Sequence, residues 1–502
     1  MGPDSRSVRS ASRHPERGYG ETRSPRSIRG RLKPATDIAA PLVGLRDMEK
    51  GTLMSVDRRD VLRTVGAATL VGLAGCNSGG RETVGNRTAT ADDYPPLGNY
   101  PVPADEVVFG ANVPKSGTYV SEGEEQLRGF RLAQDHLNTG GGAVDLWSEL
   151  SGEGVLGRTV VIAEGDTAAT PAHARQQASS LIERDGAIMI SGGSSSAVAV
   201  AVQERCQRGR VPFMACVTHA NRTTGDGCVR YGFREMPNTA MTGRALATGL
   251  ARELGSGLNF FQLYADYPWG REQRSAHNRW LTRRADWNAI GVHETGLGAT
   301  SADYANAFER VPVSETDVLV LNYYGLDADT VLRAVRETGL DRSLDLVIPL
   351  FNRLLARVNR EGIAGVYGTV PWNWQLRNDI AIAFVDSFRE RYGQVPSYAA
   401  HLAYVQTLQF AAAAERAGTF YPPEVIAQLE GHTYDNAGLG SAETLRACDH
   451  QAVRDVLFVQ GRRLTGGDTD GMFRLIESVS RSEVAYGCEE EPAVNCVLGP
   501  VR

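Results

Sequence analysis

The sequence predicts an α/β protein of two lobes, each built around a doubly wound parallel sheet. From Glu106 onward, apolar runs with strand character alternate with stretches of helical periodicity, which is typical of parallel strands joined by helices. The pattern restarts near Phe260, so the chain contains two successive rounds of it. A chain of 502 residues is long enough for two or three folding units, and one small domain is excluded.

The first round predicts the elements of lobe 1. Its amphipathic helices are expected at 123–138 and 171–184, and a helix rich in alanine and valine follows the segment Gly192 to Ser196. Its strands are expected at 107–113, 159–163, 187–191 and 210–215.

The second round predicts the elements of lobe 2. Its strands are again short apolar runs, with helical stretches between them. They are expected at 260–264, 291–294, 318–323 and 346–349.

A short segment ending at Cys76 resembles a twin-arginine export signal joined to a lipobox. Arg58 and Arg59 precede an apolar run that is too short for a membrane span, which needs about 20 residues. The run closes with Leu-Ala-Gly before Cys76, and we expect this thiol to carry lipid that anchors the protein to the outer face of the cell membrane. The alternative is a buried apolar helix.

The segments around this signal have different expected roles. We interpret 54–75 as the signal peptide and 76–104, which lacks hydrophobic periodicity, as a flexible tether. Met54 lies four residues before the arginine pair, so translation is expected to start there. Residues 1–53 would then be an extension foreign to the native protein.

The net charge differs between the N-terminal segment that includes the signal and the rest of the chain. Residues 1–75 hold 14 Lys and Arg against 8 Asp and Glu, whereas the remaining 427 residues hold 39 against 51. The body therefore has a net charge of -12 and offers no basic footprint for nucleic acid.

Six cysteines remain after Cys76, and export permits disulfides. We expect Cys216 to pair with Cys228 across a local loop, and Cys448 to pair with either Cys488 or Cys496. The partner of Cys206 is left open. No pair has CxxC spacing and the histidines are scattered, so neither a metal nor a cofactor is expected.

A set of segments then resembles a known family. In order, they read VVFGANVPKSGTYVSEGEEQLRGFRLAQDHLN, ISGGSSSAVAVAV, VPFMACVTHANRTT, YADYPWG, GIAGVYGTVPWNW and PSYAAHLAYVQTLQFAAAAERAG. Over about 105–465 the chain resembles the substrate-binding proteins of ABC importers in the branched-chain amino acid, urea and amide class. These are the type I, leucine-binding-protein-like periplasmic binding proteins.

This resemblance implies that three crossings of the chain form a hinge between the lobes. We place them near Phe233 to Glu235, near Thr369 to Trp374, and near Gly440. Lobe 1 then consists of 105–234 and 371–440. Lobe 2 consists of 235–370 and 441–502, the latter including a C-terminal tail.

Loops at the carboxyl ends of parallel strands are the expected ligand site. Ser116, Gly117 and Tyr119 follow the first strand, where glycine lets the backbone approach a ligand closely. Ser194 and Ser195 open the helix after the third strand and offer hydroxyl and N–H groups. The alternative for these serines is simple helix capping.

The resemblance implies three further contacts, and the position of Tyr324 gives a fourth. Cys216 and Thr218 occupy the position that holds a ligand's carboxylate or amide, and Trp269 occupies an aromatic contact position. Tyr324 ends a strand of lobe 2 and is expected to face the ligand, although such aromatics are often core residues. His219 is expected to be structural.

One departure from the family bears on specificity. Amino-acid binders carry an acid in the loop after the strand equivalent to 346–349, but here that loop, Leu350 to Arg353, has none. A buried ammonium without an anion is costly, so we expect a compact carboxylate or amide. Asp266 is the substitute acid if the ligand is an amino acid.

The resulting hypothesis is a non-enzymatic, monomeric, lipid-anchored protein that binds a small-molecule ligand and delivers it to an ABC permease and its ATPase. A sensor on the same fold is the main alternative. A hydrolase is disfavoured because no GxSxG or HExxH motif is present.

Overall fold

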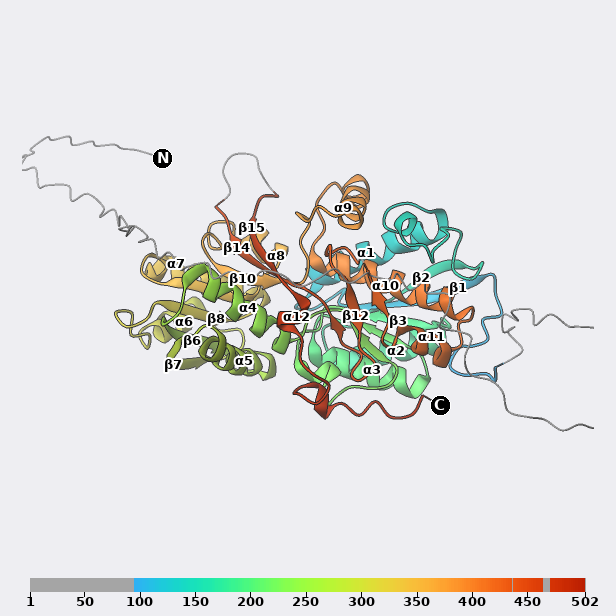
Figure 1. The fold of residues 1–502 in the computed structure, drawn as a ribbon, viewed down its shortest axis with the longest axis horizontal. Helices are drawn as coiled ribbons and strands as arrows, with labels where there is room; N and C mark the ends of the chain where they lie inside the picture. Colours follow the sequence, from blue (N-terminus) through green and yellow to red (C-terminus); the bar gives the residue numbers. More distant parts are fainter. Residues whose placement is uncertain (1–93, 436, 464–469, 502) are drawn as a thin grey trace, which may run out of the picture. The chain divides into compact units, whose positions relative to one another are not determined.

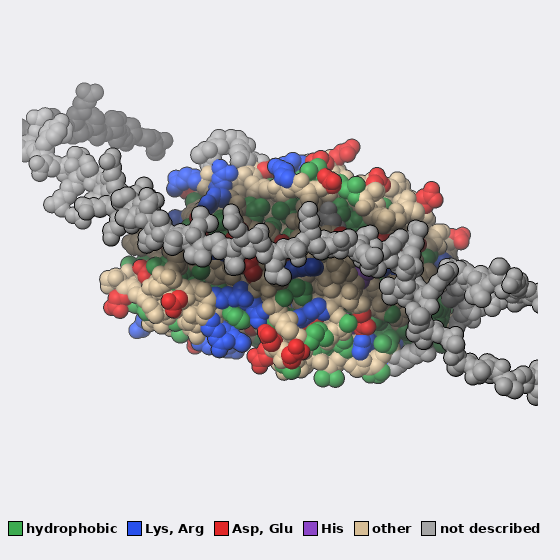
Figure 2. Space-filling view, in the orientation of Figure 1, with side chains coloured by type: hydrophobic (Ala, Val, Ile, Leu, Met, Phe, Trp, Pro, Cys, Tyr) green, Lys and Arg blue, Asp and Glu red, His purple; other side chains and the backbone are tan. Residues whose placement is uncertain are grey.

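The computed structural model describes residues 94–435, 437–463 and 470–501. The extension 1–53, the signal with Arg58, Arg59 and Cys76, and most of the tether lie outside the described residues. In the described ranges, no helix is both long and apolar enough to cross a membrane. On the face drawn in Figure 2, acidic and basic side chains are interspersed.

Lobe 1 contains a five-stranded parallel sheet in the order β2-β1-β3-β4-β5. Its strands are β1 (Glu106–Val113), β2 (Thr159–Asp166), β3 (Met189–Gly192), β4 (Phe213–Ala215) and β5 (Gly232–Arg234). The connecting helices are α1 (Val120–Thr139), α2 (Pro171–Glu183) and α3 (Ser196–Gly209). Three helices from later in the chain complete the lobe, with α10 packed along α1: α9 (Asp379–Tyr392), α10 (Tyr398–Ala417) and α11 (Pro422–Leu429).

Lobe 2 contains a seven-stranded sheet in the order β15-β14-β10-β9-β8-β6-β7. The strands are β6 (Asn259–Ala265), β7 (Asn288–Thr295), β8 (Val318–Asn322), β9 (Asp345–Leu350), β10 (Tyr367–Val370), β14 (Val456–Gly461) and β15 (Phe473–Val479). The helices are α4 (Thr239–Leu254), α5 (Pro268–Arg284), α6 (Ser301–Phe308), α7 (Gly325–Thr338), α8 (Arg353–Val358) and α12 (Arg481–Val484). Figure 1 shows β6 to β8 with α4 to α7 gathered apart from β1 to β3 with α1 to α3.

The predicted fold class is confirmed. Both expected rounds form parallel strands, and β8 is buried at every position. A strand covered on both faces loses polar alternation, which explains why such segments appear as continuous apolar runs in the sequence. The antiparallel pair β14 and β15 at the edge of lobe 2 was not expected.

Local sequence signals explain where several helices begin. The Asn238 side chain accepts a hydrogen bond from Met241 N at the start of α4. Thr300 and Asp303 form a reciprocal capping box at α6, and Pro268 opens α5. These residues satisfy N–H groups that a helix terminus leaves free, or lack the N–H altogether.

The chain passes between the two sheets three times. The first two passages lie between β5 and α4 and between β10 and α9. The third lies between β13 (Ala452–Val453) and β14, later than the expected position near Gly440. The cause is a small antiparallel sheet of β11 (Thr433–Tyr434), β12 (Glu443–Leu445) and β13. Strands of two or three residues are too short to leave a periodic signal.

The disulfides differ from the expected local pair. Cys228 pairs with Cys496, and Cys448 pairs with Cys488. The pairing of Cys216 with Cys228 is therefore wrong. Cys216 follows β4 and is fully buried, with its Sγ 3.9 Å from the carbonyl oxygen of Ala399 on α10, so it faces the interior of lobe 1. Cys206 is also a buried thiol.

Candidate ligand-binding site

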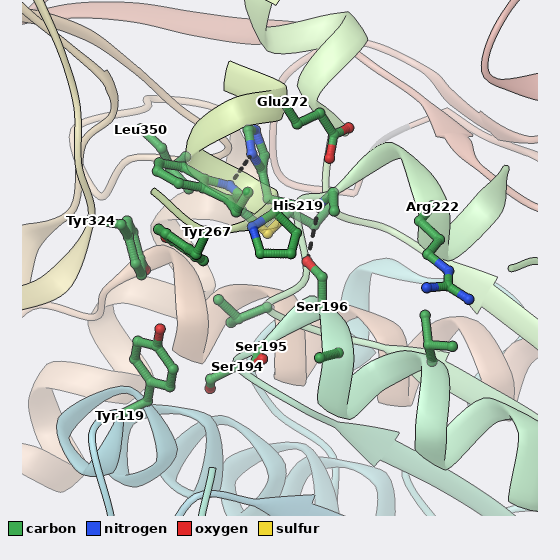
Figure 3. A pocket seen from close by; sticks show the side chains of 17 residues that line it. Tyr119, Ser194, Ser195, Ser196, His219, Arg222, Tyr267, Glu272, Tyr324 and Leu350 are labelled. Carbon is green, nitrogen blue, oxygen red and sulfur yellow. Dashed lines mark hydrogen bonds between the residues drawn. The ribbon is translucent and has the colours of Figure 1, made fainter. Parts of the chain in front are cut away.

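A cavity of about 320 Å³ lies where the carboxyl ends of both sheets meet. Its lining comes from segments after β1, β3, β4 and β5 in lobe 1 and from the ends of β6, β8 and β9 or the segments after them in lobe 2, and Figure 3 shows the labelled side chains. The lining residues are Tyr119, Ser194, Ser195, Ser196, Ala197, Val200, Val217, His219, Ala220, Arg222, Met236, Tyr267, Pro268, Trp269, Glu272, Tyr324 and Leu350.

The serine loop of lobe 1 forms the polar side of the cavity. Gly192 has φ +132°, and a Cβ there would lie 2.2 Å from the carbonyl oxygen of Asn112, so only glycine fits this turn. Ser195 occupies the N-cap position of α3 but its side chain does not cap the helix. Ser194 accepts a hydrogen bond of 2.7 Å from Gln126. The Ser195 hydroxyl and the N–H groups at the start of α3 are therefore available to an oxygen-bearing ligand.

Aromatic rings form the opposite wall. Tyr267 stacks on Trp269 with ring centroids 5.9 Å apart, and Tyr324 lies 5.8 Å from Trp269. Tyr119 of lobe 1 approaches Tyr324 at 6.3 Å, so the wall includes a ring from each lobe. Flat, largely apolar faces of this kind suit the hydrocarbon part of a small ligand.

His219 orients Trp269. The indole Nε1 donates to His219 Nδ1 at 3.0 Å, and Gln273 Nε2 donates to the same nitrogen at 2.9 Å. Nδ1 is thus the acceptor, and Nε2 carries the proton toward Thr242 Oγ1 at 2.9 Å. Burial lowers the pKa of His219 to about 3, so the ring is neutral. His219 therefore has the structural contacts that were expected for it, and it also lines the cavity.

Two carboxyl groups near the cavity have a raised pKa. Glu272 of α5 lines the cavity, and burial raises its pKa to about 7 even though the backbone N–H of Asn221 donates to it at 2.6 Å. Burial likewise raises the pKa of Glu122 to about 7. The Tyr324 hydroxyl donates to Glu122 and is 2.7 Å from the Tyr398 hydroxyl, so this acid lies behind the aromatic wall.

The structure brings five of the nine expected contact residues to the cavity. They are Tyr119, Ser194, Ser195, Trp269 and Tyr324.

The other four lie elsewhere. Ser116 is exposed and donates to Asp166, and Gly117 packs beside Ala168. Thr218 is buried and its hydroxyl is 3.0 Å from that of Thr223, behind the lining. Cys216 points into the core of lobe 1, as described above.

The candidate acid Asp266 is not in the lining either. It pairs with Arg271 at 2.6 Å on a partly exposed surface. Glu272 lies one helical turn after Trp269, so the two residues share a face of α5. Helical spacing from Trp269, an expected contact, could therefore have predicted that Glu272 lines the cavity. Tyr267 stands two residues before Trp269, within the segment YADYPWG that carries the family resemblance.

An α/β fold of two lobes, with a cavity at the carboxyl ends of both sheets, is the architecture typical of two-lobed solute-binding proteins. The family described as periplasmic binding protein matches residues 106–468, and the chain belongs to this family.

Individual relatives agree with this assignment. The chain is 26% identical to the Leu/Ile/Val-binding protein homolog 8 of Brucella abortus over 241 residues, which are 47% of this chain and 56% of the relative. The chain thus spans just over half of that relative's length.

Solved structures share the fold. The amino acid ABC transporter substrate-binding protein of Pseudomonas fluorescens Pf-5 is 21% identical, with a TM-score of 0.68 over 79% of this chain and 100% of the other. A solute binding protein of Rhodopseudomonas palustris BisB5, in complex with 3,4-dihydroxy benzoic acid, is 16% identical with a TM-score of 0.63 over 75% and 97%.

Proposed function

We propose that this protein is the lipid-anchored solute-binding component of an ABC importer. The observation that carries the proposal is the cavity lined by residues of both lobes, because a ligand there would hold the lobes together. Membership of the periplasmic binding protein family supports an extracytoplasmic, non-enzymatic role. The proposed partners are a small-molecule ligand and the permease and ATPase subunits, with the binding protein acting as a monomer.

The ligand is a compact organic solute with a carboxylate or amide head and an apolar body. The head faces Ser195 and the start of α3, where hydroxyl and N–H donors gather. The body contacts Trp269 and Tyr324. Charge-assisted hydrogen bonds contribute about 1.5 to 3 kcal/mol each, so two or three of them with the aromatic wall account for micromolar affinity.

Glu272 is the group in the described lining that could pair with an amine. Burial raises its pKa to about 7, so this carboxyl is less readily ionised than an ordinary glutamate. An α-amino group on the ligand is therefore dispensable in this proposal. The names of the relatives include both amino-acid binders and a neighbour solved with an aromatic acid.

Calorimetric titration with leucine, its deaminated acid and 3,4-dihydroxybenzoic acid tests the proposal. We expect at least one of the two acids to bind as tightly as leucine or more tightly. Trp269→Ala should weaken that binding about tenfold or more, whereas Trp280→Ala, outside the lining on the same helix, should not. Tight binding of leucine together with much weaker binding of its deaminated acid would contradict the proposal and place the protein among the amino-acid binders.

A further inference from the structure

A second cavity, of about 400 Å³, is lined largely by arginines. Arg353, Arg357 and Arg360 come from α8 and the residues after it in lobe 2, and Arg389 comes from α9 beside lobe 1. Asp470 is the acidic residue in this described lining, which therefore carries a net charge of +3. None of these residues lines the cavity between the serine loop and the aromatic wall.

Arg353 is the central feature of this second cavity. The residue is only 4% exposed, yet its Nε and Nη1 atoms have no hydrogen-bond partner among the described residues. Burial lowers the pKa of Arg353. A buried guanidinium without a counter-ion is costly, so its place in the wall of a cavity points to a partner that the chain does not supply.

The nearby acids are already engaged. Glu125 accepts hydrogen bonds from Arg128, Gln394 and Ser397 N at 2.8 to 3.0 Å. Asp470 pairs with Arg389 at 2.9 Å. Neither carboxylate forms an ion pair with Arg353 within the described part of the chain.

Arg357 and Arg360, unlike Arg389, have a weak partner or none among the described residues. Arg357 makes a long hydrogen bond of 3.4 Å to Gln394, and Arg360 is exposed without a described hydrogen bond or ion pair. Their charges are therefore free to act on the cavity together with Arg353.

We propose that this cavity binds a small oxyanion of two or more negative charges, of the phosphate or sulfate type. The planar guanidinium fork matches two oxygens of such an anion, and a net charge of +3 favours a dianion over chloride. Because α8 belongs to lobe 2 and Arg389 and Gln394 lie on lobe 1, the bound anion bridges the lobes. The anion thus stabilises the arrangement in which they are in contact.

Thermal unfolding and calorimetry of the full chain with inorganic phosphate and with sulfate test this site. At constant ionic strength, set with sodium chloride, we expect a saturable rise in Tm with either dianion. Arg353→Gln should lower the affinity about tenfold or more, and Arg360→Gln should lower it less. Arg283→Gln, an exposed arginine of lobe 2 outside the cavity, removes the same charge and should bind like the parent. A response no greater than that of chloride, or an Arg353→Gln variant that binds like the parent, overturns the proposal.

The Tm of Arg353→Gln without dianion distinguishes anion binding from a purely structural role of Arg353. The proposal predicts that, in the absence of dianion, Arg353→Gln keeps or raises Tm, because it removes a buried charge without a described partner. A large loss of Tm without anion, together with an unchanged phosphate response, would assign the arginine to folding alone.

The phosphate group of a lipid, which carries a single negative charge in phosphatidylglycerol, is the other source of phosphate oxygens. Sedimentation of the Cys76→Ser chain with phosphatidylglycerol vesicles separates the two. Binding of free phosphate without co-sedimentation supports the free anion. Co-sedimentation that needs Arg353, without a response to free phosphate, overturns it.

Discussion

The carboxyl group of Glu122 is buried at the contact between the lobes. It lies in the first turn of α1 and accepts a hydrogen bond from Tyr324, a residue of lobe 2 that also receives one of 3.3 Å from Asn352. Its Oε2 atom has no partner among the described residues. Desolvation therefore outweighs the single hydrogen bond and raises the pKa of Glu122 to about 7.

This raised pKa predicts a pH-dependent loss of stability. The folded protein keeps a proton on Glu122 that the unfolded chain, with a pKa near 4.5, releases. The free energy of unfolding should therefore fall as pH rises from about 4.5 to 7. The glutamine side chain of Glu122→Gln cannot ionise. Between pH 5 and 8, the free energy of unfolding of this variant should therefore fall by on the order of 1 to 3 kcal/mol less than that of the parent. Urea unfolding at each pH measures the difference.

The exposed neighbour Glu124 provides the matched control. Glu124→Gln lies in the same helix and should retain the full pH dependence of the parent. Equal slopes for the parent and Glu122→Gln would contradict a buried, titrating Glu122.

The C-terminal tail after β15 is held to the rest of the protein by two disulfides. It leaves lobe 2 through α12, which packs on α4, and Arg244 of α4 pairs with Glu490 at 3.0 Å. Its two cysteines are bonded to Cys448 and to Cys228, and Cys228 precedes β5 of lobe 1. The tail is therefore attached to both lobes.

The disulfide arrangement predicts the thiol count. Denatured, unreduced protein carrying Cys76→Ser should expose two thiols, those of Cys206 and Cys216. Full reduction should raise the number to six. Labelling with a maleimide followed by mass spectrometry measures both states, and six thiols before reduction would contradict the pairing.

The two disulfides should differ in their effect on stability. Cys228 and Cys496 are 268 residues apart, whereas Cys448 and Cys488 are 40 apart. Loop-closure entropy grows with the logarithm of this separation. Replacing Cys228 and Cys496 by serine should lower the free energy of unfolding by about 2 to 5 kcal/mol. Replacing Cys448 and Cys488 should lower it by about 1 to 2 kcal/mol less than that. Denaturant unfolding of the two double variants measures the difference, and the opposite order would contradict the entropic account.

The three passages between the lobes meet at one buried side chain. Arg454, in the third passage, forms an ion pair with Glu235 of the first and donates to the carbonyl oxygen of Pro371 in the second at 3.1 Å. Glu443 lies 3.6 Å from Arg454 Nε, and burial beside Glu235 raises the pKa of Glu443. This cluster joins the three hinge segments through one buried guanidinium.

Such a hinge predicts closure around the ligand. The lobes touch through the contact of Tyr324 with Glu122 and that of Trp269 with His219, so the structure corresponds to a closed arrangement. Without ligand, no solute holds the lobes together, and the open form should gain population. Small-angle scattering should show a smaller radius of gyration when a ligand from the titration series is saturating. An identical curve with and without ligand would indicate a rigid scaffold.

Attachment of the protein to the membrane depends on one residue outside the described range. Two or more acyl chains hold a protein on a bilayer, so Cys76→Ser should move it from the membrane to the soluble fraction. Cell fractionation and immunoblotting measure the distribution, with Cys206→Ser as a control that leaves the lipobox intact. A Cys76→Ser variant that stays on the membrane like the parent would contradict the anchor.

The sequence by itself determined the features that contiguous residues encode. Buried strands such as β8 appear as apolar runs and amphipathic helices such as α1 repeat at helical spacing, so two α/β lobes could be predicted. Glycine and serine after β3 likewise marked a turn and a helix start. An aromatic residue at a strand end identified Tyr324, whereas Trp269 was identified by the family resemblance.

Only the tertiary structure decided which distant residues meet. Cys228 pairs with Cys496 instead of the nearby Cys216, because Cys216 faces α10 in the core of lobe 1. The cavity includes Glu272 but excludes Thr218, whose hydroxyl is turned toward Thr223. Contacts between segments hundreds of residues apart follow from how helices and strands pack, and one sequence carries no local periodicity that records this packing.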